Sequence, residues 1–329
     1  MIDYSVIIRT TGKAGEKYQK LLDSIADLNP QPKEVIVVLP ENSQLPSEKL
    51  GWERFCFCKK GMVTQRLFGI YSCKTKYALI CDDDVCFEKD FVVKLHQPIQ
   101  EGVAKLSAGP LLSYLPPKGY KSILYAITGA AIPQYFANEK YISVLPTTGY
   151  SYYRKINIEE HRYLEAESLP WTCFYGEVDA VKKIHLEDER WLESHGYASM
   201  DDQTMFYKAY LMKIRTVIVS DAVYQHLDAK TSRKILSDIA YAMEFNRYIF
   251  WHRFIYSMDR GIKKKWDICC IEYYFSIKSL YNVIRYLKGE LDKDAINAKK
   301  VALEDAKKYV KTEEYKSLPE IKNMSLEKY

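Results

Sequence analysis

Three consecutive aspartates, Asp82, Asp83 and Asp84, are the residues of this sequence best suited to chemistry. They directly follow an apolar run at 77–81 that has the composition of a buried strand. Unpaired carboxylates this close repel one another, and a hard divalent cation relieves the repulsion. Asp82 and Asp84 project to the same side of an extended chain, so we expect them to chelate a metal together with a bridging diphosphate. A solvated acidic turn or a helix cap is the alternative interpretation.

The elements that must position these aspartates are typical of a parallel sheet. Apolar, β-branched runs predict strands at 4–8, 35–39 and 77–81, and helical spacing of apolar residues predicts helices at 16–28 and 63–71. Strands and helices that alternate in this way build a sheet covered on both faces, and such sheets bind ligands beyond the carboxyl ends of their strands. The aspartates follow a strand at that edge.

The middle of the chain is less regular. Prolines and glycines interrupt residues 106–170, which predicts irregular structure with one or two edge strands. A strand and a helix are expected around 174–184, a helix beginning near Asp201, and a strand at 216–219. Long helical patterns follow, so we expect an α/β catalytic domain at 1–229 and a helical C-terminal extension at 230–329.

Several segments occur in an order that carries a family resemblance. They are Tyr-Ser-Val-Ile-Ile-Arg-Thr-Thr from residue 4, Glu-Val-Ile-Val-Val from residue 34, Gln-Arg at 65–66, Tyr-Ala-Leu-Ile-Cys-Asp-Asp-Asp from residue 77, Asp-Asp-Gln-Thr from residue 201 and Val-Tyr-Gln-His at 223–226. In this order they resemble the nucleotide-sugar half of family 2 glycosyltransferases, over residues 4 to about 228. The resemblance implies an α/β fold of the GT-A type, with a mostly parallel central sheet, followed by the helical extension.

The resemblance also implies a reaction. The chain would be an inverting, metal-dependent glycosyltransferase that moves a sugar from a nucleoside-diphosphate sugar to a carbohydrate or lipid-linked acceptor, in the assembly of cell-surface polysaccharide. Mn²⁺ or Mg²⁺ held by Asp82 and Asp84 would neutralise the departing diphosphate. His226 would ligate the metal or contact the diphosphate, although a lone histidine after a strand is more often structural.

Inversion at the anomeric carbon needs a carboxylate that takes the proton of the attacking hydroxyl. By its match to the family's acidic pair, Asp202 is the expected base and Asp201 the alternative. Either one is also a good N-cap for the helix that begins there.

The resemblance further assigns residues to the two substrates. The residues expected to bind the donor are Thr10, Glu41, Arg66, Asp82 and Asp83. Glu41 stands in for an acidic pair that the family usually carries after its second strand, and Leu67 replaces the family's usual asparagine after Arg66. The acceptor side is assigned to Trp171, Tyr175 and Gly176, beside a tyrosine-rich stretch between Gly109 and Trp171.

Composition sets the remaining limits. The 329 residues carry a net charge of +5, too small to imply nucleic-acid binding. The eight cysteines contain no CxxC pair, which fits a reducing cytoplasm, and no signal peptide or membrane-spanning run is recognisable. Residues 230–288 hold 12 basic and 5 acidic residues, so the positive surplus of the chain is concentrated there.

Within this basic segment, one helix face carries an apolar seam. The seam consists of Trp266, Cys270, Tyr273, Ile277, Leu280, Ile284 and Leu287. We expect it to pack on the catalytic domain with a solvated basic flank. A helix lying on an anionic membrane surface, which would make the protein peripheral on the inner face of the membrane, and a homodimer contact are the alternatives.

Two other functions remain open from the sequence. A sugar-phosphate nucleotidyltransferase shares the β-α-β start and the metal carboxylates, but it expects a glycine-rich basic signature where this chain has Arg9-Thr10-Thr11-Gly12. A membrane-surface binding module without enzymatic activity would have no use for the aspartates and His226.

Overall fold

A computed structural model describes residues 2–112, 140–153, 156–228 and 236–321, with Ile123, Ala126 and Ile127 between the first two ranges. Tyr114, Tyr120, Tyr125 and Tyr135 of the tyrosine-rich stretch lie outside the described residues. In the part of the chain that is described, no helix combines the length and apolar character needed to cross a membrane.

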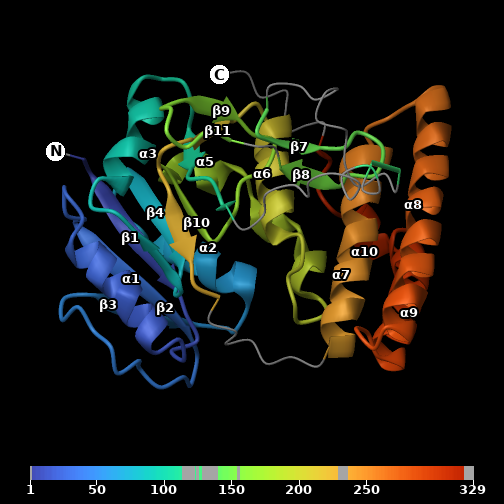
Figure 1. The fold of residues 1–329 in the computed structure, drawn as a ribbon, viewed down its shortest axis with the longest axis horizontal. Coiled ribbons are helices and arrows are strands. Elements are labelled where there is room, and N and C mark those ends of the chain that lie inside the picture. The colour runs from blue at the N-terminus through green and yellow to red at the C-terminus, as the bar shows by residue number, and fades with distance from the viewer. Residues whose placement is uncertain are drawn as a thin grey trace.

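An eight-stranded sheet forms the centre of the molecule (Figure 1). In sheet order its strands are β3 (Arg54–Cys58), β2 (Glu34–Pro40), β1 (Tyr4–Arg9), β4 (Tyr77–Asp82), β10 (Cys173–Glu177), β6 (Leu106–Ala108), β11 (Thr216–Val219) and β9 (Tyr163–Glu165). Neighbouring strands are parallel from β3 to β4 and between β6 and β11, while β10 and β9 run antiparallel to their neighbours. The expected mostly parallel α/β sheet is confirmed.

Two small sheets and a set of helices complete the fold. β5 (Val85–Phe87) pairs with β12 (Tyr224–His226), and β7 (Ile142–Val144) pairs with β8 (Ser151–Tyr153). The helices are α1 (Glu16–Ala26), α2 (Met62–Ser72), α3 (Phe91–Gln100), α5 (Val178–Lys183), α6 (Asp201–Leu211), α7 (Leu236–Trp251), α8 (Gly261–Leu287), α9 (Lys293–Tyr309) and α10 (Glu313–Lys316), with short 3₁₀ turns at Leu186–Asp188 and Arg190–Glu193 and a π-helical turn at His252–Tyr256.

The sheet separates two apolar layers, because successive strand residues face opposite sides. Val6 and Ile8 of β1 pack with α1 and α3, whereas Ile7 packs with α2, α5 and α6. The second layer continues without interruption into the C-terminal helices, whose Phe250, Trp251 and Phe254 are buried in the same cluster as Ile7. The helical segment and the sheet therefore share one core.

Helix α8 corrects the expected packing of its apolar seam. It lies on the outer side of α7 and α9 (Figure 1) and buries Ile271, Tyr274 and Phe275 against the rest of the chain. The seam instead faces outward, since Trp266 is 61% exposed, Leu280 60% and Leu287 77%. The apolar spacing was real, but the neighbouring face of the helix makes the contact with the core.

The region 106–170 is more ordered within the described residues than the sequence predicts. It contributes four strands: β9 lies at the edge of the sheet, as expected, but β6 lies between β10 and β11 in the sheet interior. The three-residue length of β6 explains the miss, because so short a run has no readable periodicity.

Candidate active site

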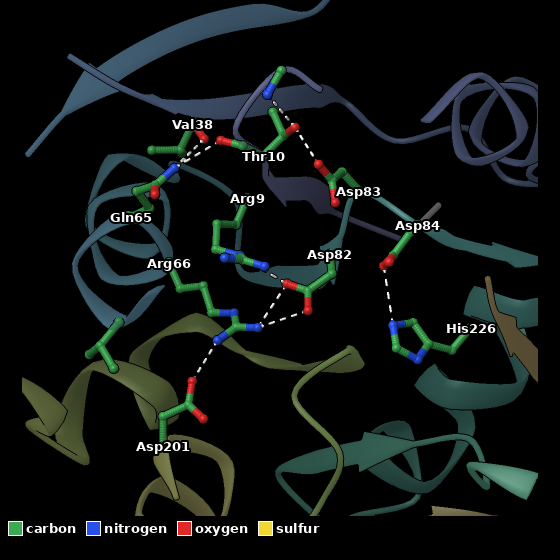
Figure 2. Close-up of polar contacts among 12 residues, drawn as sticks. Arg9, Thr10, Val38, Gln65, Arg66, Asp82, Asp83, Asp84, Asp201 and His226 are labelled. Atoms are coloured by element: carbon green, nitrogen blue, oxygen red, sulfur yellow. Dashed lines mark hydrogen bonds and ion pairs between the residues drawn. The ribbon is translucent and has the colours of Figure 1, made fainter. Parts of the chain in front are cut away.

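The carboxyl ends of β1 and β4 and the start of α6 bring the predicted polar residues together. Figure 2 shows Thr10, Arg66, Asp82, Asp83, Asp84, Asp201 and His226 in this one region. The three consecutive aspartates each have a different partner. The chain turns at Asp83 and Asp84 instead of staying extended. Separate partners therefore offset the mutual repulsion of the three carboxylates.

Asp82 is held by two arginines. Arg66 donates from Nη2 to both carboxylate oxygens, at 2.7 and 3.0 Å, and Arg9 donates from Nε to Oδ1 at 3.1 Å. All three side chains are largely shielded from solvent. Because the turn directs Asp84 elsewhere, the geometry favours an ion-pairing role for Asp82 over the chelating role expected from the sequence.

Arg66 connects the DDD segment to α6. Its Nη1 donates to Asp201 Oδ2 at 2.7 Å, while its Nη2 binds Asp82. The guanidinium lies 4.7 Å from the centroid of the buried Trp171 ring, at a distance typical of a cation–π contact. This buried arginine holds two carboxylates from distant parts of the chain at a fixed separation.

Local features of α2 bring Arg66 to this position. A Cβ on Gly69 would lie 2.4 Å from Ile7 Cγ2, so only glycine lets the helix approach β1 this closely. Glu193 caps the start of the helix by accepting from the backbone N–H groups of Val63 at 2.8 Å and Thr64 at 3.3 Å. Gln65 Nε2 then donates to the carbonyl oxygens of Thr10 and Val38, 3.0 Å from each.

Asp83 pairs with the loop that follows β1. Thr10 Oγ1 donates to Asp83 Oδ2 at 2.5 Å and accepts from the backbone N–H of Gly12 at 2.9 Å. Burial raises the pKa of Asp83 to about 6. Glu41, which the resemblance assigns to donor binding, directly follows β2 and is exposed. It therefore lies at the end of the strand next to β1.

Asp84 faces His226, at a distance of 3.3 Å between Oδ1 and Nε2. Pairing of β5 with β12 sets this contact, because His226 lies opposite Val85 in register, and Leu227 N donates to the Asp84 carbonyl at 2.7 Å. The hydrogen bond to Asp84 raises the pKa of His226. A carboxylate oxygen and an imidazole nitrogen are suitable ligands for Mn²⁺.

This pair would be an incomplete metal site by itself. Within the described ranges no group of three or more His, Cys, Asp or Glu side chains could hold a metal ion. A cation bound by Asp84 and His226 would take its remaining ligands from water or from a bound molecule such as a diphosphate.

Asp201 and Asp202 open α6 in different surroundings. Asp201 is buried and paired with Arg66, whereas Asp202 is more accessible and accepts from Gln203 N at 2.6 Å. Burial raises the pKa of Asp201 to about 7 and also raises that of Asp202. The positive charges of Arg66 and Arg247 favour the ionised form of Asp202 and so counteract part of the rise in its pKa. Asp202 is thus the better placed of the two to accept a proton.

The C-terminal helices help to hold α6. Lys208 Nζ, buried in the interior, lies 3.2 Å from Glu189 Oε1, and the same carboxylate accepts two hydrogen bonds from Arg253 in the π-helical turn that follows α7. Gly149 O accepts from Gln203 at 2.5 Å and from Arg247 of α7 at 3.4 Å. These contacts tie the position of the acidic pair to the helical segment.

The residues expected on the acceptor side are packing residues. Tyr175 is fully buried in β10, where its hydroxyl lies 3.1 Å from His96 Nδ1. A Cβ on Gly176 would lie 2.4 Å from Leu106 Cδ2, so the glycine serves strand packing. Trp171 is also buried and contacts Arg66. Their burial leaves little exposed surface for an acceptor to contact, and Trp171 instead packs against the guanidinium of Arg66.

Arg9, Gln65 and Arg247 are functional candidates that the sequence reasoning missed. Arg9 and Gln65 contact the site residues directly, and the charge of Arg247 acts on Asp202. The sequence could have indicated Arg9, because this charged residue ends an otherwise largely apolar strand. Arg247 is remote in sequence and belongs to a helix with no motif.

We predict that Arg66→Ala destabilises the fold. Removing the guanidinium leaves the buried carboxylate of Asp201 without its partner and Asp82 with Arg9 alone, a loss of about 3–5 kcal/mol in unfolding free energy. Arg54→Ala removes the exposed pair with Glu34 and should cost about 0–1 kcal/mol. Denaturant unfolding of both variants checks the prediction, and equal effects would contradict it.

Comparison with known proteins places the fold. No family model matches the chain, and no curated protein matches its sequence. Among solved structures, GalNAc-T7 with UDP, GalNAc and Mn²⁺ superposes with a TM-score of 0.51 at 11% identity, over 84% of this chain and 56% of that one. The chain has the GT-A fold. TarS of S. aureus also matches, with a TM-score of 0.45 and 15% identity over 83% of this chain and 43% of its own. The chain thus spans about half the length of the structures that it matches.

Proposed function

We propose that this chain is a metal-dependent, inverting glycosyltransferase of family 2, which transfers a sugar from a nucleoside-diphosphate sugar to a carbohydrate or lipid-linked acceptor in polysaccharide assembly. The observation that carries the proposal is the Asp84–His226 pair, at 3.3 Å, in the region beyond the end of β4 where Figure 2 also shows Asp82 and Asp201. The bound UDP and Mn²⁺ of the GalNAc-T7 structure support a donor and a cation of the same classes here.

The donor half of the proposal rests on β1, β2 and β4. Thr10 and Asp83 hold each other at the end of β1, and exposed Glu41 lies after β2, so a nucleoside can bind across these strand ends. Asp84 and His226 would hold Mn²⁺ or Mg²⁺, which neutralises negative charge on the departing diphosphate. Arg9 and Arg66 hold the Asp82 carboxylate in position beside these residues.

The acceptor half rests on α6. Asp202 takes the proton from the acceptor hydroxyl as that oxygen bonds to the anomeric carbon from the face opposite the diphosphate. The carbon–oxygen bond to the diphosphate breaks with its electron pair leaving on the diphosphate, so the configuration inverts. Asp201 is kept in place by Arg66 and cannot accept a proton without losing that ion pair.

The acidic pair predicts the pH dependence of transfer. The base must be ionised, and burial raises the pKa values of both Asp201 and Asp202, that of Asp201 to about 7. The turnover rate should therefore rise as pH increases and level off at a higher pH than it would for a solvated carboxyl, with the apparent pKa belonging to the pair. Steady-state kinetics across the pH range checks this, and a rate that levels off near pH 4, as for a solvated carboxyl, would contradict it.

A donor panel tests the proposed reaction. Uridine, guanosine, cytidine and thymidine diphosphate sugars are incubated with Mn²⁺, and release of the nucleoside diphosphate is scored. A glycosyltransferase releases the diphosphate from at least one donor, and NMR of the product then reports the anomeric configuration. A sugar-phosphate nucleotidyltransferase would instead release pyrophosphate from a nucleoside triphosphate and a sugar phosphate, which would overturn the proposal.

A further inference from the structure

The outward face of α8 is unusually apolar for a surface helix. Trp266, Tyr273, Leu280, Ile284 and Leu287 are all more than 40% exposed, and Ile262 at the start of the helix is 86% exposed. Solvent-exposed apolar residues are ordinary when scattered, but a contiguous stripe of them marks an interaction surface. These six residues are called the α8 stripe below.

The stripe is continuous along the helix. Its members are three, four or seven residues apart along the 27 residues of α8, so they stay on one side of the helix for about 40 Å at 1.5 Å per residue. The helix forms the outer edge of the molecule beyond α7 and α9 (Figure 1). Within the part of the chain that the structure describes, the stripe residues are exposed, so a flat partner could contact the whole stripe.

Charge limits what that partner can be. Lys263, Lys264 and Lys265 stand at the start of α8, and Arg285 and Lys288 at its end. The acidic Glu272 beside the stripe is paired with Lys307 at 2.7 Å, and the acidic Asp267 is buried on the inner face. Lys263 pairs with Asp259 at 2.7 Å and Arg285 pairs with Glu290 at 3.2 Å. Among the described residues, no ion pair neutralises Lys265 or Lys288. The stripe therefore lies between two positive ends.

This pattern disfavours a second copy of the chain. In a parallel pair of α8 helices Lys265 and Lys288 would each face their own counterparts, and in an antiparallel pair they would face each other. Both arrangements set like charges against each other. An anionic lipid surface instead neutralises both ends at once, while the aromatic rings of Trp266 and Tyr273 suit the headgroup level.

We propose that the α8 stripe docks this protein on an anionic membrane surface, with the stripe in the headgroup–acyl boundary and the terminal lysines against lipid phosphates. Long lysine side chains beside an apolar stripe can reach the headgroups while their stems lie on the lipid. This surface does not depend on the proposed glycosyl transfer, and its test uses no substrate.

Vesicle flotation of the full chain tests the docking. The chain should float with phosphatidylcholine–phosphatidylglycerol vesicles and bind phosphatidylcholine vesicles at least tenfold more weakly. Changing Trp266, Tyr273, Leu280 and Leu287 together to Ser should abolish binding. Lys265→Glu with Lys288→Glu should weaken it by roughly fivefold or more per lysine on the anionic vesicles only.

Matched controls separate docking from folding defects and from self-association. Trp52→Ser with Phe57→Ser removes exposed aromatic residues elsewhere and should leave binding unchanged. The thermal unfolding midpoint should agree among all variants, because every changed side chain is exposed. Trp266 emission in a Trp52→Phe background should shift to the blue on anionic vesicles. Equal flotation of wild type and the Ser variant, or a lipid-free dimer that the Ser variant makes monomeric, would overturn the proposal.

Discussion

Asp84→Ala and His226→Ala should each lower the rate of nucleoside-diphosphate release by about 10³-fold at saturating Mn²⁺. Each substitution removes one of the two side chains that face each other at 3.3 Å and that would hold the cation. A metal that neutralises a leaving diphosphate contributes several kcal/mol to the transition state, and each 1.36 kcal/mol is worth about tenfold in rate. Initial rates with the active donor from the panel measure the effect.

The matched controls for this prediction are His161→Ala and Asp221→Ala. They break a histidine–aspartate pair of the same types, at 2.7 Å, between a loop residue and the turn after β11. Their rates should stay within about twofold of wild type. If the Asp84 and His226 variants retain the same activity as these controls, the proposed metal ligands are wrong.

Asp202→Asn should lower the turnover number by about 10²–10⁴-fold while leaving donor affinity unchanged. The amide keeps the size of the side chain and can still accept from Gln203 N through its oxygen, but it cannot take the acceptor proton. The turnover number should therefore fall while the dissociation constant of the donor stays the same. The acidic limb of the pH profile should also disappear from the residual activity.

Asp201→Asn is the natural comparison, because it changes the adjacent carboxylate. Its main effect should be on stability, since Arg66 loses a charged partner in a buried pair at 2.7 Å. Denaturant unfolding together with kinetics distinguishes the two variants. A larger loss of turnover in a stably folded Asp201→Asn than in Asp202→Asn would make Asp201 the base.

The sequence predicted the elements that carry long apolar patterns. The strand and helix positions of the first 82 residues are correct to within two residues, apart from β3, whose residues Arg-Phe-Cys-Phe-Cys do not form an apolar β-branched run. The start of α6 and the strand β11 were also placed correctly. Short strands such as β5 and β6 were not predicted, because three residues are too few to show a periodic apolar pattern.

The candidate site was predictable in its members but not in its pairings. The order of motifs brought Thr10, Asp82 to Asp84, Asp201 and His226 to one edge, yet whether Asp82 met a metal or an arginine depended on the turn at Asp83. Tyr175 is buried because β10 lies inside the sheet, between β4 and β6. This position results from pairing with strands distant in sequence, which local patterns do not reveal. The outward direction of the α8 stripe likewise depended on which helix face met α7 and α9.

Electron paramagnetic resonance of Mn²⁺ tests the central claim most directly, because it reports free Mn²⁺ as protein is titrated with a nucleoside diphosphate present. The Asp84–His226 site predicts one Mn²⁺ bound per chain, tighter with the diphosphate than without it. The Asp84→Ala/His226→Ala double variant should lose this binding while His161→Ala keeps it. Equal Mn²⁺ binding by the double variant and wild type, or none by wild type, would contradict the account.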